Sequence, residues 1–408
     1  MMQGIKKEIE EVVSSLKKEG KEHLASEIRK NWRKNLLEYS KHIHSYRPDR
    51  PMEKILKRAF LKEFKRLGYA TEESAEIIKH MEKRRILETA PHISPAGKPR
   101  FFFIDWLASL ALSADDFLPI AMFSGVPFSN KTRPGRLCRK SGDINLLPAV
   151  MQDELAYRSK IPPKMDRVIK TQVRELETLL PKAKTGESYT KWALQASQNI
   201  EGRFLGGRPV FFDFNEVASN YLLLAIKDAE HPVSRMLFSP SERKITARNF
   251  KQSVFFYASY KKNGREQMES FFLRDGYLEN ATRRIKLDPK ILAEELRGRL
   301  CPGLVIGFFI FSFMNRFQCF GSFAQVEYLP LYRKKFIKFP FLKKYDIKNA
   351  PSGVLTTGGF PENPELYPLD VALGDKFSPN PTLLFGQALL AIKDVLLEHN
   401  YSLNLVKK

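Results

Sequence analysis

The chain contains 408 residues, of which 43% are hydrophobic and 28% are charged. This composition excludes an intrinsically disordered chain, and the length leaves room for two or three folded domains. Lysine and arginine number 68 against 46 acidic residues, which gives a formal charge of +22. Such an excess indicates an acidic partner, either an anionic small molecule, a nucleic acid or a membrane surface.

Other features of the composition favour a cytoplasmic protein. The 3 cysteines are too few and too widely spaced for a disulfide framework or a Cys-x-x-Cys metal site. The first 22 residues are strongly charged and lack the apolar centre of a secretory signal. The longest apolar run, Gly303 to Met314, is much shorter than the ~20 residues that a membrane-spanning helix needs. We therefore expect a cytoplasmic protein without a membrane span.

Residues 1–87 are predicted to form an N-terminal helical region. One apolar stripe at helical spacing comprises Met52, Leu56, Phe60, Phe64 and Leu67. Gly68 is expected to end this helix, and Thr71 to begin the next as its N-cap. Such a pair of basic helices suits a helix-turn-helix reader of DNA. We favour the alternative of a helical appendage whose charges face water.

From residue 86 the pattern changes to short apolar runs separated by proline, glycine and serine. Strands are expected at 86–93, 117–123, 209–214, 253–260 and before 321, and helices at 101–113, 164–180, 188–200, 215–228 and after 321. Strand, helix and strand with short connections form βαβ units and hence a parallel sheet. The predicted fold is α/β, with a Rossmann-like parallel sheet carrying helices on both faces in residues 88–345. Residues 346–408 are expected to add a loop and a helix, at 382–399, that pack on this core.

In an open parallel sheet, ligands bind beyond the carboxyl ends of the strands. The loop after the first predicted strand contains Thr89, His92, Ser94, Lys98 and Arg100. This loop leads into the helix at 101–113. The N–H groups at a helix N-terminus, next to a lysine, favour an anion. We therefore predict that this loop forms one side of an anion-binding site.

The loop after the second predicted strand carries the same electrostatic bias. Its polar and basic residues include Ser124, Asn130, Arg133 and Arg136, among turn-forming prolines and glycines. Arg133 and Arg136 can make bidentate contacts with a carboxylate or phosphate. We predict that they bind the anion, the alternative being a solvated basic turn.

Two side chains are candidates for moving a proton. His92 lies at a predicted strand end, where a functional histidine competes with the alternative of a buried structural one. Glu327 follows Gly321 and Ser322 at a strand-to-helix corner, together with Gln325 and Tyr328. Glu327 can bind a substrate amine or act as a general base. Alternatively, Tyr328 packs in the core while Glu327 faces water.

Several established motifs are missing. The sequence contains no G-x-x-x-x-G-K-[ST], no G-x-G-x-x-G, no H-E-x-x-H and no G-x-S-x-G. A Walker loop, a zinc protease site and a serine-hydrolase elbow are therefore not predicted, and no metal site is expected. The cofactor is not identified by the sequence, and a nucleotide such as ATP stays open as a candidate.

A segment at 333–348 interleaves lysines and arginine with aromatic residues. Such a pattern can bind single-stranded nucleic acid through phosphate contacts and base stacking. The alternative is a basic loop whose aromatic side chains anchor it to the domain. Because no recognised RNA- or DNA-binding motif accompanies the segment, a nucleic-acid partner is kept as the second hypothesis.

Three segments share motifs with a known family: residues 76–112, 296–311 and 315–332. In the first, Thr89 and His92 fall near a Thr-Gly-[His/Gln]-Gln-type turn. In the last, Gly321, Ser322 and Tyr328 fall near a Gly-Gly-Pro-x-Glu-[Ile]-Ala-Tyr stretch. On these motifs the chain resembles the bacillithiol synthases, a family of cysteine-adding ligases. The resemblance implies a nucleotidyltransferase-like Rossmann core with a substrate cleft and an amide-forming condensation.

The leading hypothesis is a biosynthetic ligase or transferase that joins an anionic small molecule to an amine-bearing, amino-acid-like partner. In it, Arg133 and Arg136 hold the anion, and His92 or Glu327 takes the proton that makes the amine nucleophilic. The alternatives are the nucleic-acid-binding protein and a non-catalytic relative that retains the fold.

Overall fold

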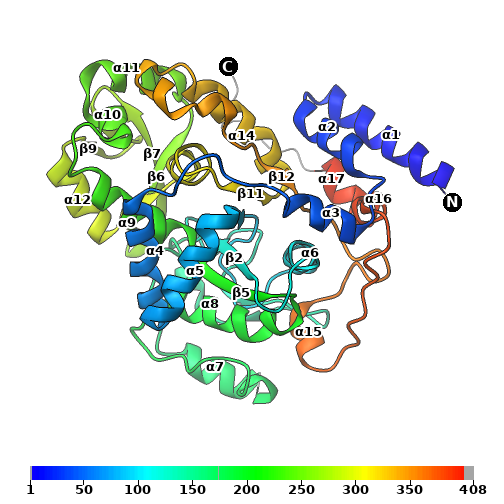
Figure 1. The fold of residues 1–408 in the computed structure, drawn as a ribbon. Helices are drawn as coiled ribbons and strands as arrows, with labels where there is room; N and C mark the ends of the chain where they lie inside the picture. Colours follow the sequence, from blue (N-terminus) through cyan, green and yellow to red (C-terminus); the bar gives the residue numbers. More distant parts are fainter. Residues whose placement is uncertain (1, 173, 399–408) are drawn as a thin grey trace.

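The computed structural model describes residues 2–172 and 174–398 (Figure 1). Its centre is a five-stranded parallel sheet with the order β12-β11-β1-β2-β5. Its strands are β1 (Ile86–Glu88), β2 (Phe117–Met122), β5 (Arg208–Asp213), β11 (Gln318–Gly321) and β12 (Val354–Leu355). The predicted α/β fold with a Rossmann-like parallel sheet is confirmed.

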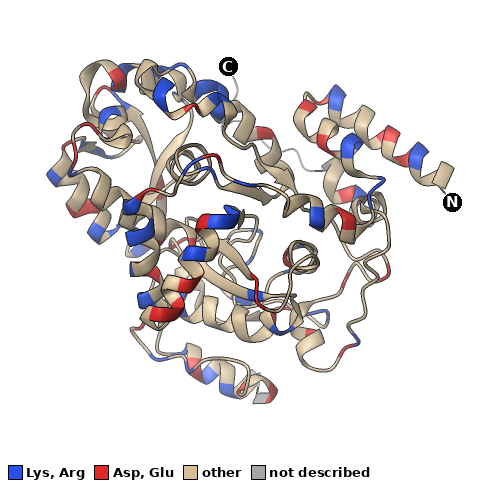
Figure 2. Cartoon of the chain, viewed as in Figure 1, with Lys and Arg blue, Asp and Glu red and all other residues tan. Residues whose placement is uncertain are grey.

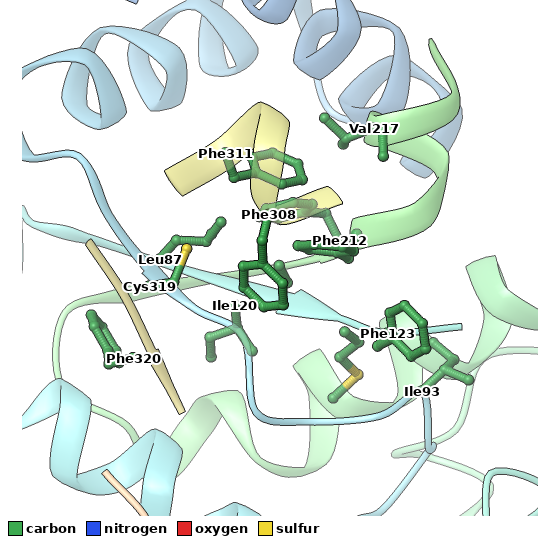
Figure 3. Packing of buried hydrophobic residues seen from close by; sticks show 14 of the residues in the cluster. Leu87, Ile93, Ile120, Phe123, Phe212, Val217, Phe308, Phe311, Cys319 and Phe320 are labelled. Atoms are coloured by element: carbon green, nitrogen blue, oxygen red, sulfur yellow. The ribbon is translucent and has the colours of Figure 1, made fainter. Parts of the chain in front are cut away.

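Helices cover both faces of this sheet. Its covering helices include α6 (Pro99–Ser109), α8 (Tyr189–Ile200), α9 (Phe214–Ala225), α13 (Leu304–Phe308) and α14 (Phe323–Phe336). A π-helical segment, Phe309–Met314, continues α13. Figure 3 shows Phe308 and Phe311 of these two segments packed over Leu87, Ile120 and Phe212 of the sheet. The sheet is therefore buried on both faces, as its continuous apolar strands require.

The N-terminal helical region packs on the same core. It comprises α1 (Met2–Lys18), α2 (Glu22–Asn31), α3 (Leu36–Ile43), α4 (Lys54–Leu67) and α5 (Thr71–Arg84). Gly68 ends α4 with φ 101°, in the left-handed region, as predicted. The prediction that Thr71 is the N-cap of α5 is wrong, because Ala70 occupies that position and no side chain caps the helix. The apolar side chains of these helices belong to one cluster with those of the sheet.

A second, antiparallel sheet lies in residues 254–302. It has the order β10-β6-β7-β8-β9 and is accompanied by short helices. The elements are α10 (Pro232–Phe238), α11 (Pro240–Asn249), β6 (Val254–Lys262), β7 (Arg265–Arg274), β8 (Tyr277–Glu279), β9 (Arg284–Lys286), α12 (Pro289–Gly298) and β10 (Cys301–Pro302). The sequence predicted only β6, because β7 to β9 alternate between half-buried polar and apolar residues.

Other predicted boundaries differ from the structure. The strand expected at 86–93 ends at Glu88: Pro91 has no N–H to donate to a ladder, and His92 forms only an isolated bridge with Phe123. The helix expected at 164–180 is reduced to α7 (Met165–Gln172) and a short turn at Arg174–Leu176. The helix expected at 382–399 is divided into α16 (Phe385–Leu390) and α17 (Lys393–Glu398), and its last residue lies outside the described residues.

The remaining short elements complete the chain. They are β3 (Arg136–Leu137), β4 (Ile144–Asn145) and α15 (Pro368–Ala372). In the described part of the chain, no helix combines the length and the apolar character needed to cross a bilayer.

Candidate functional site

The strand order places a crevice between β1 and β11. From β1 the chain proceeds to β2 and β5 on one side, and later returns to β11 and β12 on the other side. Doubly wound sheets bind ligands at such a reversal, beyond the carboxyl ends of the strands. A cavity with about 610 Å³ of empty space lies there, and we call it the switch-point cavity. Its lining comprises Ala90, His92, Arg100, Phe101, Ile104, Thr132, Ser322, Phe323, Ala324 and Thr357.

Two helices begin at the switch-point cavity. Helix α6 has Pro99 in its first turn, where a missing N–H costs nothing, and Arg100 and Phe101 follow in the cavity lining. Helix α14 has Ser322 as its N-cap, and Ser322 is also part of the lining. The first N–H groups of a helix have no acceptor within it and carry partial positive charge. The cavity is therefore biased towards an anion by two helix termini and the Arg100 guanidinium.

His92 is held beside the end of β2 by the backbone. The Ile93 N–H donates to the Phe123 carbonyl at 3.0 Å, and the Phe123 N–H donates to the Pro91 carbonyl at 2.9 Å. The loop that follows β1 thus runs alongside the residue that follows β2. His92 and the arginine-rich loop after Phe123 consequently lie next to each other.

A hydrogen-bonded chain links His92 to that loop. Thr132 Oγ1 lies 2.8 Å from Asn130 Oδ1 and 3.2 Å from His92 Nδ1. Asn130 Oδ1 also accepts the Thr132 N–H at 2.9 Å, so it must be the amide oxygen. The Thr132 hydroxyl proton therefore goes to Asn130, and Thr132 Oγ1 accepts a proton from His92 Nδ1. This network assigns the proton of His92 to Nδ1 and leaves Nε2 as the acceptor.

His92 is uncharged at neutral pH. Burial lowers the pKa of His92 to about 4, with a further contribution from the nearby charge of Arg100. At neutral pH the imidazole therefore has a lone pair on Nε2 that can accept a proton. An anion bound beside Arg100 would offset that charge and raise the pKa of His92.

A second hollow lies on the other side of Asn130. Its empty space is about 920 Å³, and we call it the cationic hollow. Its lining comprises Lys98, Phe128, Ser129, Asn130, Lys131, Arg133, Arg136 and Gln152. Asn130 and Thr132 connect it to the switch-point cavity through the hydrogen bond described above. The structure thus brings Lys98, Asn130, Arg133 and Arg136 together, as the sequence predicted.

Arg133 differs from its predicted role in one respect. Its guanidinium forms an ion pair with Asp143, so part of its charge is already balanced within the protein. Its backbone has φ 61°, in the left-handed region, which is unusual for a residue with a Cβ. Arg136, which begins β3, forms no ion pair among the described residues. Arg136 is therefore the stronger candidate for binding an anion.

Four predicted binding residues are buried in structural hydrogen bonds and do not line the cavity. Thr89 Oγ1 donates to Gln325 Oε1 at 2.9 Å, which fixes α14 to the end of β1. Ser94 Oγ donates to the Ala96 carbonyl at 3.2 Å. Ser124 Oγ donates to Asp213 Oδ1 at 2.8 Å, and this bond joins the ends of β2 and β5. These side chains shape the loops around the site, and their place outside the cavity lining gives no support to the prediction that they contact a ligand.

Gly321 ends β11 and lies next to the cavity without being part of its lining. A Cβ at this position would come within 2.6 Å of Gln325 Oε1 and 3.1 Å of the Ala90 nitrogen. Glycine therefore allows α14 to approach the loop that follows β1. Its role is to permit this approach rather than to bind a ligand.

Glu327 and Tyr328 are not part of the lining of the switch-point cavity. Glu327 Oε1 accepts the backbone N–H of Leu24 in helix α2 at 2.6 Å, and its side chain is buried. Tyr328 packs against Phe308 and Tyr332, with ring centroids 5.5 and 5.3 Å away. The position of Glu327 therefore gives no support to the prediction that it is a general base, and His92 is the stronger candidate.

The structure adds residues that the sequence did not single out. Thr132 and Thr357 line the switch-point cavity, and Gln152 lines the cationic hollow. Thr132 lies within the arginine-rich loop, so its position was a usable signal. Thr357 follows the two-residue strand β12 and Gln152 lies in an irregular region, and neither has a sequence pattern around it that indicates a site.

Two buried carboxyl groups support the loop that leads into α6. Asp105 of α6 and Glu201 at the end of α8 are neighbours, and burial raises the pKa of both groups, that of Glu201 to about 7. Glu201 Oε1 also accepts the Gly97 N–H at 3.0 Å. Glu201 thus holds the loop immediately before Lys98, next to the buried Asp105 carboxyl group.

The segment at 333–348 is tied to the domain. Phe336 and Phe339 are fully buried, and Arg333 Nη1 donates to the Ala350 carbonyl at 2.7 Å. These two rings cannot stack on bases, which removes much of the argument for a nucleic-acid site there. Figure 2 shows lysines and arginines spread over many helices, with acidic residues mixed among them along α1 and α7.

No family model, curated protein or solved structure matches this chain. Within the described residues, no group of three or more His, Cys, Asp or Glu side chains is arranged to hold a metal ion. The functional argument therefore depends on the geometry of the switch-point cavity and the cationic hollow.

Proposed function

We propose that this protein is a small-molecule ligase or transferase that joins an anionic substrate to an amine-bearing partner in the switch-point cavity. The observation that carries the proposal is the series of hydrogen bonds from Asn130 through Thr132 to His92. These bonds leave His92 Nε2 unprotonated in a cavity that favours an anion. The expected resemblance to amide-forming ligases agrees with this chemistry and adds no independent support.

The proposed role of His92 is to deprotonate the amine. An amine attacks an acyl or phosphoryl centre only as the free base, so a proton must be removed before or during attack. As the new bond to nitrogen forms, the bond from that centre to its leaving group breaks, so the anionic substrate must enter this step activated, for example as an acyl phosphate that releases phosphate. His92 Nε2 would accept that proton, and Thr132 Oγ1 would hold the resulting imidazolium in place through Nδ1. Binding of the anionic substrate beside Arg100 would raise the pKa of His92 at the moment when a stronger base is needed.

The proposed role of the two helix N-termini is to bind the anion. The amides at the start of α6 and α14 and the Arg100 guanidinium would contact the substrate's negative group. These groups would also stabilise the additional negative charge that develops when an amine adds to a carbonyl. Since they are fixed by the sheet and its helices, little reorganisation would accompany the reaction.

A ligand screen followed by one conservative variant tests this proposal. Carboxylates, amino acids and nucleotides should include compounds that raise the melting temperature by binding the native state. For an active pair of substrates, the change His92→Asn keeps an N–H for Thr132 and removes Nε2. We expect turnover to fall about 10²- to 10⁴-fold with substrate binding retained.

His42 provides the matched control because it is exposed on α3. The change His42→Asn should leave turnover unchanged. Wild-type turnover in the His92→Asn protein, with the fold intact, would overturn the assignment.

A further inference from the structure

The cationic hollow has an unbalanced charge. Of its four cations, Arg133 is paired with Asp143, while Lys98, Lys131 and Arg136 form no ion pair with any described residue. Burial lowers the pKa of Lys98, and the charges of Arg133, Arg100 and Arg136 lower it further. Like charges have therefore been gathered around an open space at an energetic cost, which a bound anion would offset.

The neutral side chains of the hollow also present donors. Asn130 uses its Oδ1 to accept from Thr132, so its Nδ2 is the end left for another contact. Gln152 Nε2 is buried and has no hydrogen-bond partner among the described residues. No aspartate or glutamate is part of the lining. A buried donor without an acceptor is costly, and it indicates that an acceptor group belongs in this space.

We propose that the cationic hollow is a subsite for the diphosphate or triphosphate group of a phosphorylated co-substrate. A single carboxylate would pair with one cation and leave the others unbalanced, whereas a phosphate chain carries several charges and many acceptor oxygens. Arg136 can bind two such oxygens at once. The flexible side chains of Lys98 and Lys131 can each place an ammonium group beside another oxygen of the phosphate chain.

The position of the hollow links this subsite to the reaction. Lys98 lines the hollow and Arg100 lines the switch-point cavity, and they flank Pro99 at the start of α6. The two spaces also share the Asn130 to Thr132 hydrogen bond. A co-substrate anchored by its phosphates in the hollow would present its other end to His92. Only this last step rests on the proposed function, since phosphate binding itself does not need His92.

Binding of inorganic polyphosphates to the full chain tests the inference. Sodium pyrophosphate and tripolyphosphate, titrated at constant ionic strength, should raise the melting temperature and give a calorimetric binding signal. The double change Lys131→Ala with Arg136→Ala should weaken this binding about 10- to 100-fold. The change Arg136→Lys should give an intermediate loss, because it keeps the charge and removes the bidentate contact.

The matched control removes two other exposed lysines, with Lys251→Ala and Lys261→Ala. This protein should bind pyrophosphate like the wild type. An equal loss in the control would mean that only the overall charge attracts the ligand, and the inference would fail. Absence of pyrophosphate and tripolyphosphate binding to the wild type would also overturn it.

The two proposals can fail separately. If His92→Asn retains full turnover while the hollow variant loses pyrophosphate binding, the base assignment is wrong and the phosphate subsite stands. If the hollow variant binds polyphosphate normally while His92→Asn loses turnover, the phosphate subsite is wrong and the base assignment stands.

Discussion

The Thr132 hydroxyl links the switch-point cavity to the cationic hollow. Its Oγ1 donates to Asn130 and accepts from His92, and its N–H fixes the orientation of the same asparagine amide. The side chain is buried, so water cannot readily replace these bonds. Thr132 is therefore a positioning residue: it sets which nitrogen of His92 carries the proton.

Removal of this hydroxyl should affect stability and the pH profile together. The change Thr132→Val keeps the shape and leaves His92 Nδ1 and Asn130 Oδ1 each short of a partner. We expect the free energy of unfolding to fall by about 1–3 kcal/mol in urea titrations. For an active substrate pair, the pH at which turnover is half-maximal should also move. Thr132→Ser should restore both properties, and an unchanged pH profile in Thr132→Val would contradict the positioning role.

The buried pair Asp105 and Glu201 predicts a pH-dependent stability. The pKa of Glu201 is about 7 in the folded chain and 4.5 when exposed. Between these values the folded state holds a proton that the unfolded state has released. The contribution of Glu201 to the free energy of unfolding therefore decreases as the pH rises from 4.5 to 7, by on the order of 3 kcal/mol.

A difference measurement isolates this contribution, because His92 acts in the opposite direction. The lowered pKa of His92 makes the folded state hold fewer protons between about 4 and 6.5, so its contribution to stability increases with pH there. Glu201→Gln should remove the decline due to Glu201, which appears as a smaller loss of melting temperature between pH 5 and pH 8. Glu230→Gln, at an exposed site, should follow the wild-type curve.

At the scale of elements, the sequence predicted the buried apolar strands and the helices that cover them. It did not predict the half-buried strands β7 to β9. The runs at 117–123 and 209–214 are continuous because both faces of those strands are covered. Strand β7 has only partial burial, so its pattern resembles that of a loop. Its turn did carry a signal: Asn263 and Gly264 both have positive φ, and Asn-Gly is the commonest hairpin pair.

The sequence predicted the loops that form the candidate site, but it could not exclude every residue that lies outside the site. The rule for strand ends selected the loops after β1 and β2 and hence His92, Lys98, Asn130 and Arg136. It could not exclude Glu327, because the acceptor role of that side chain depends on Leu24, which is 303 residues away in the chain. Contacts at this separation have no local pattern.

Helix α13 packs against α9 through a glycine. A Cβ at Gly307 would overlap the ring of Phe214, the first residue of α9. Gly307→Ala should therefore destabilise the protein by about 1–3 kcal/mol, measured as a lower midpoint in urea. Gly298→Ala, in the exposed last turn of α12, meets no neighbouring atom and should be neutral or stabilising. Equal midpoints for the two variants would show that α13 can move away at no cost.

At the scale of the whole molecule, the N-terminal helices are part of the core. Leu24 of α2 donates to Glu327 of α14, and the Tyr39 hydroxyl of α3 donates to the Leu355 carbonyl of β12. Side chains of α1 to α5 share one apolar cluster with the sheet. We therefore expect a single cooperative unfolding transition, with agreement between calorimetric and van 't Hoff enthalpies. Two separate transitions would mean that the N-terminal region is an independent unit.

The bond from Glu327 to Leu24 makes a further prediction about the whole molecule. Glu327→Ala leaves a buried N–H of α2 without an acceptor, and the free energy of unfolding should fall by about 1–3 kcal/mol. Because this residue does not line the switch-point cavity, ligands identified for the cavity should bind the variant with unchanged affinity. A selective loss of ligand binding in a stably folded Glu327→Ala protein would return Glu327 to the list of candidates for the active site.

The link between Tyr39 and Leu355 has a consequence for how the chain is made. During synthesis, α2 and α3 emerge more than 300 residues before the segments on which they rest. Until then α2 can pack only on α1, and α3 only on α6, so part of their apolar faces stays uncovered, and a nascent chain in that condition is prone to aggregate or to be held by chaperones. The contacts that fix α2 and α3 on α14 and β12 can therefore form only after more than 300 further residues have been made.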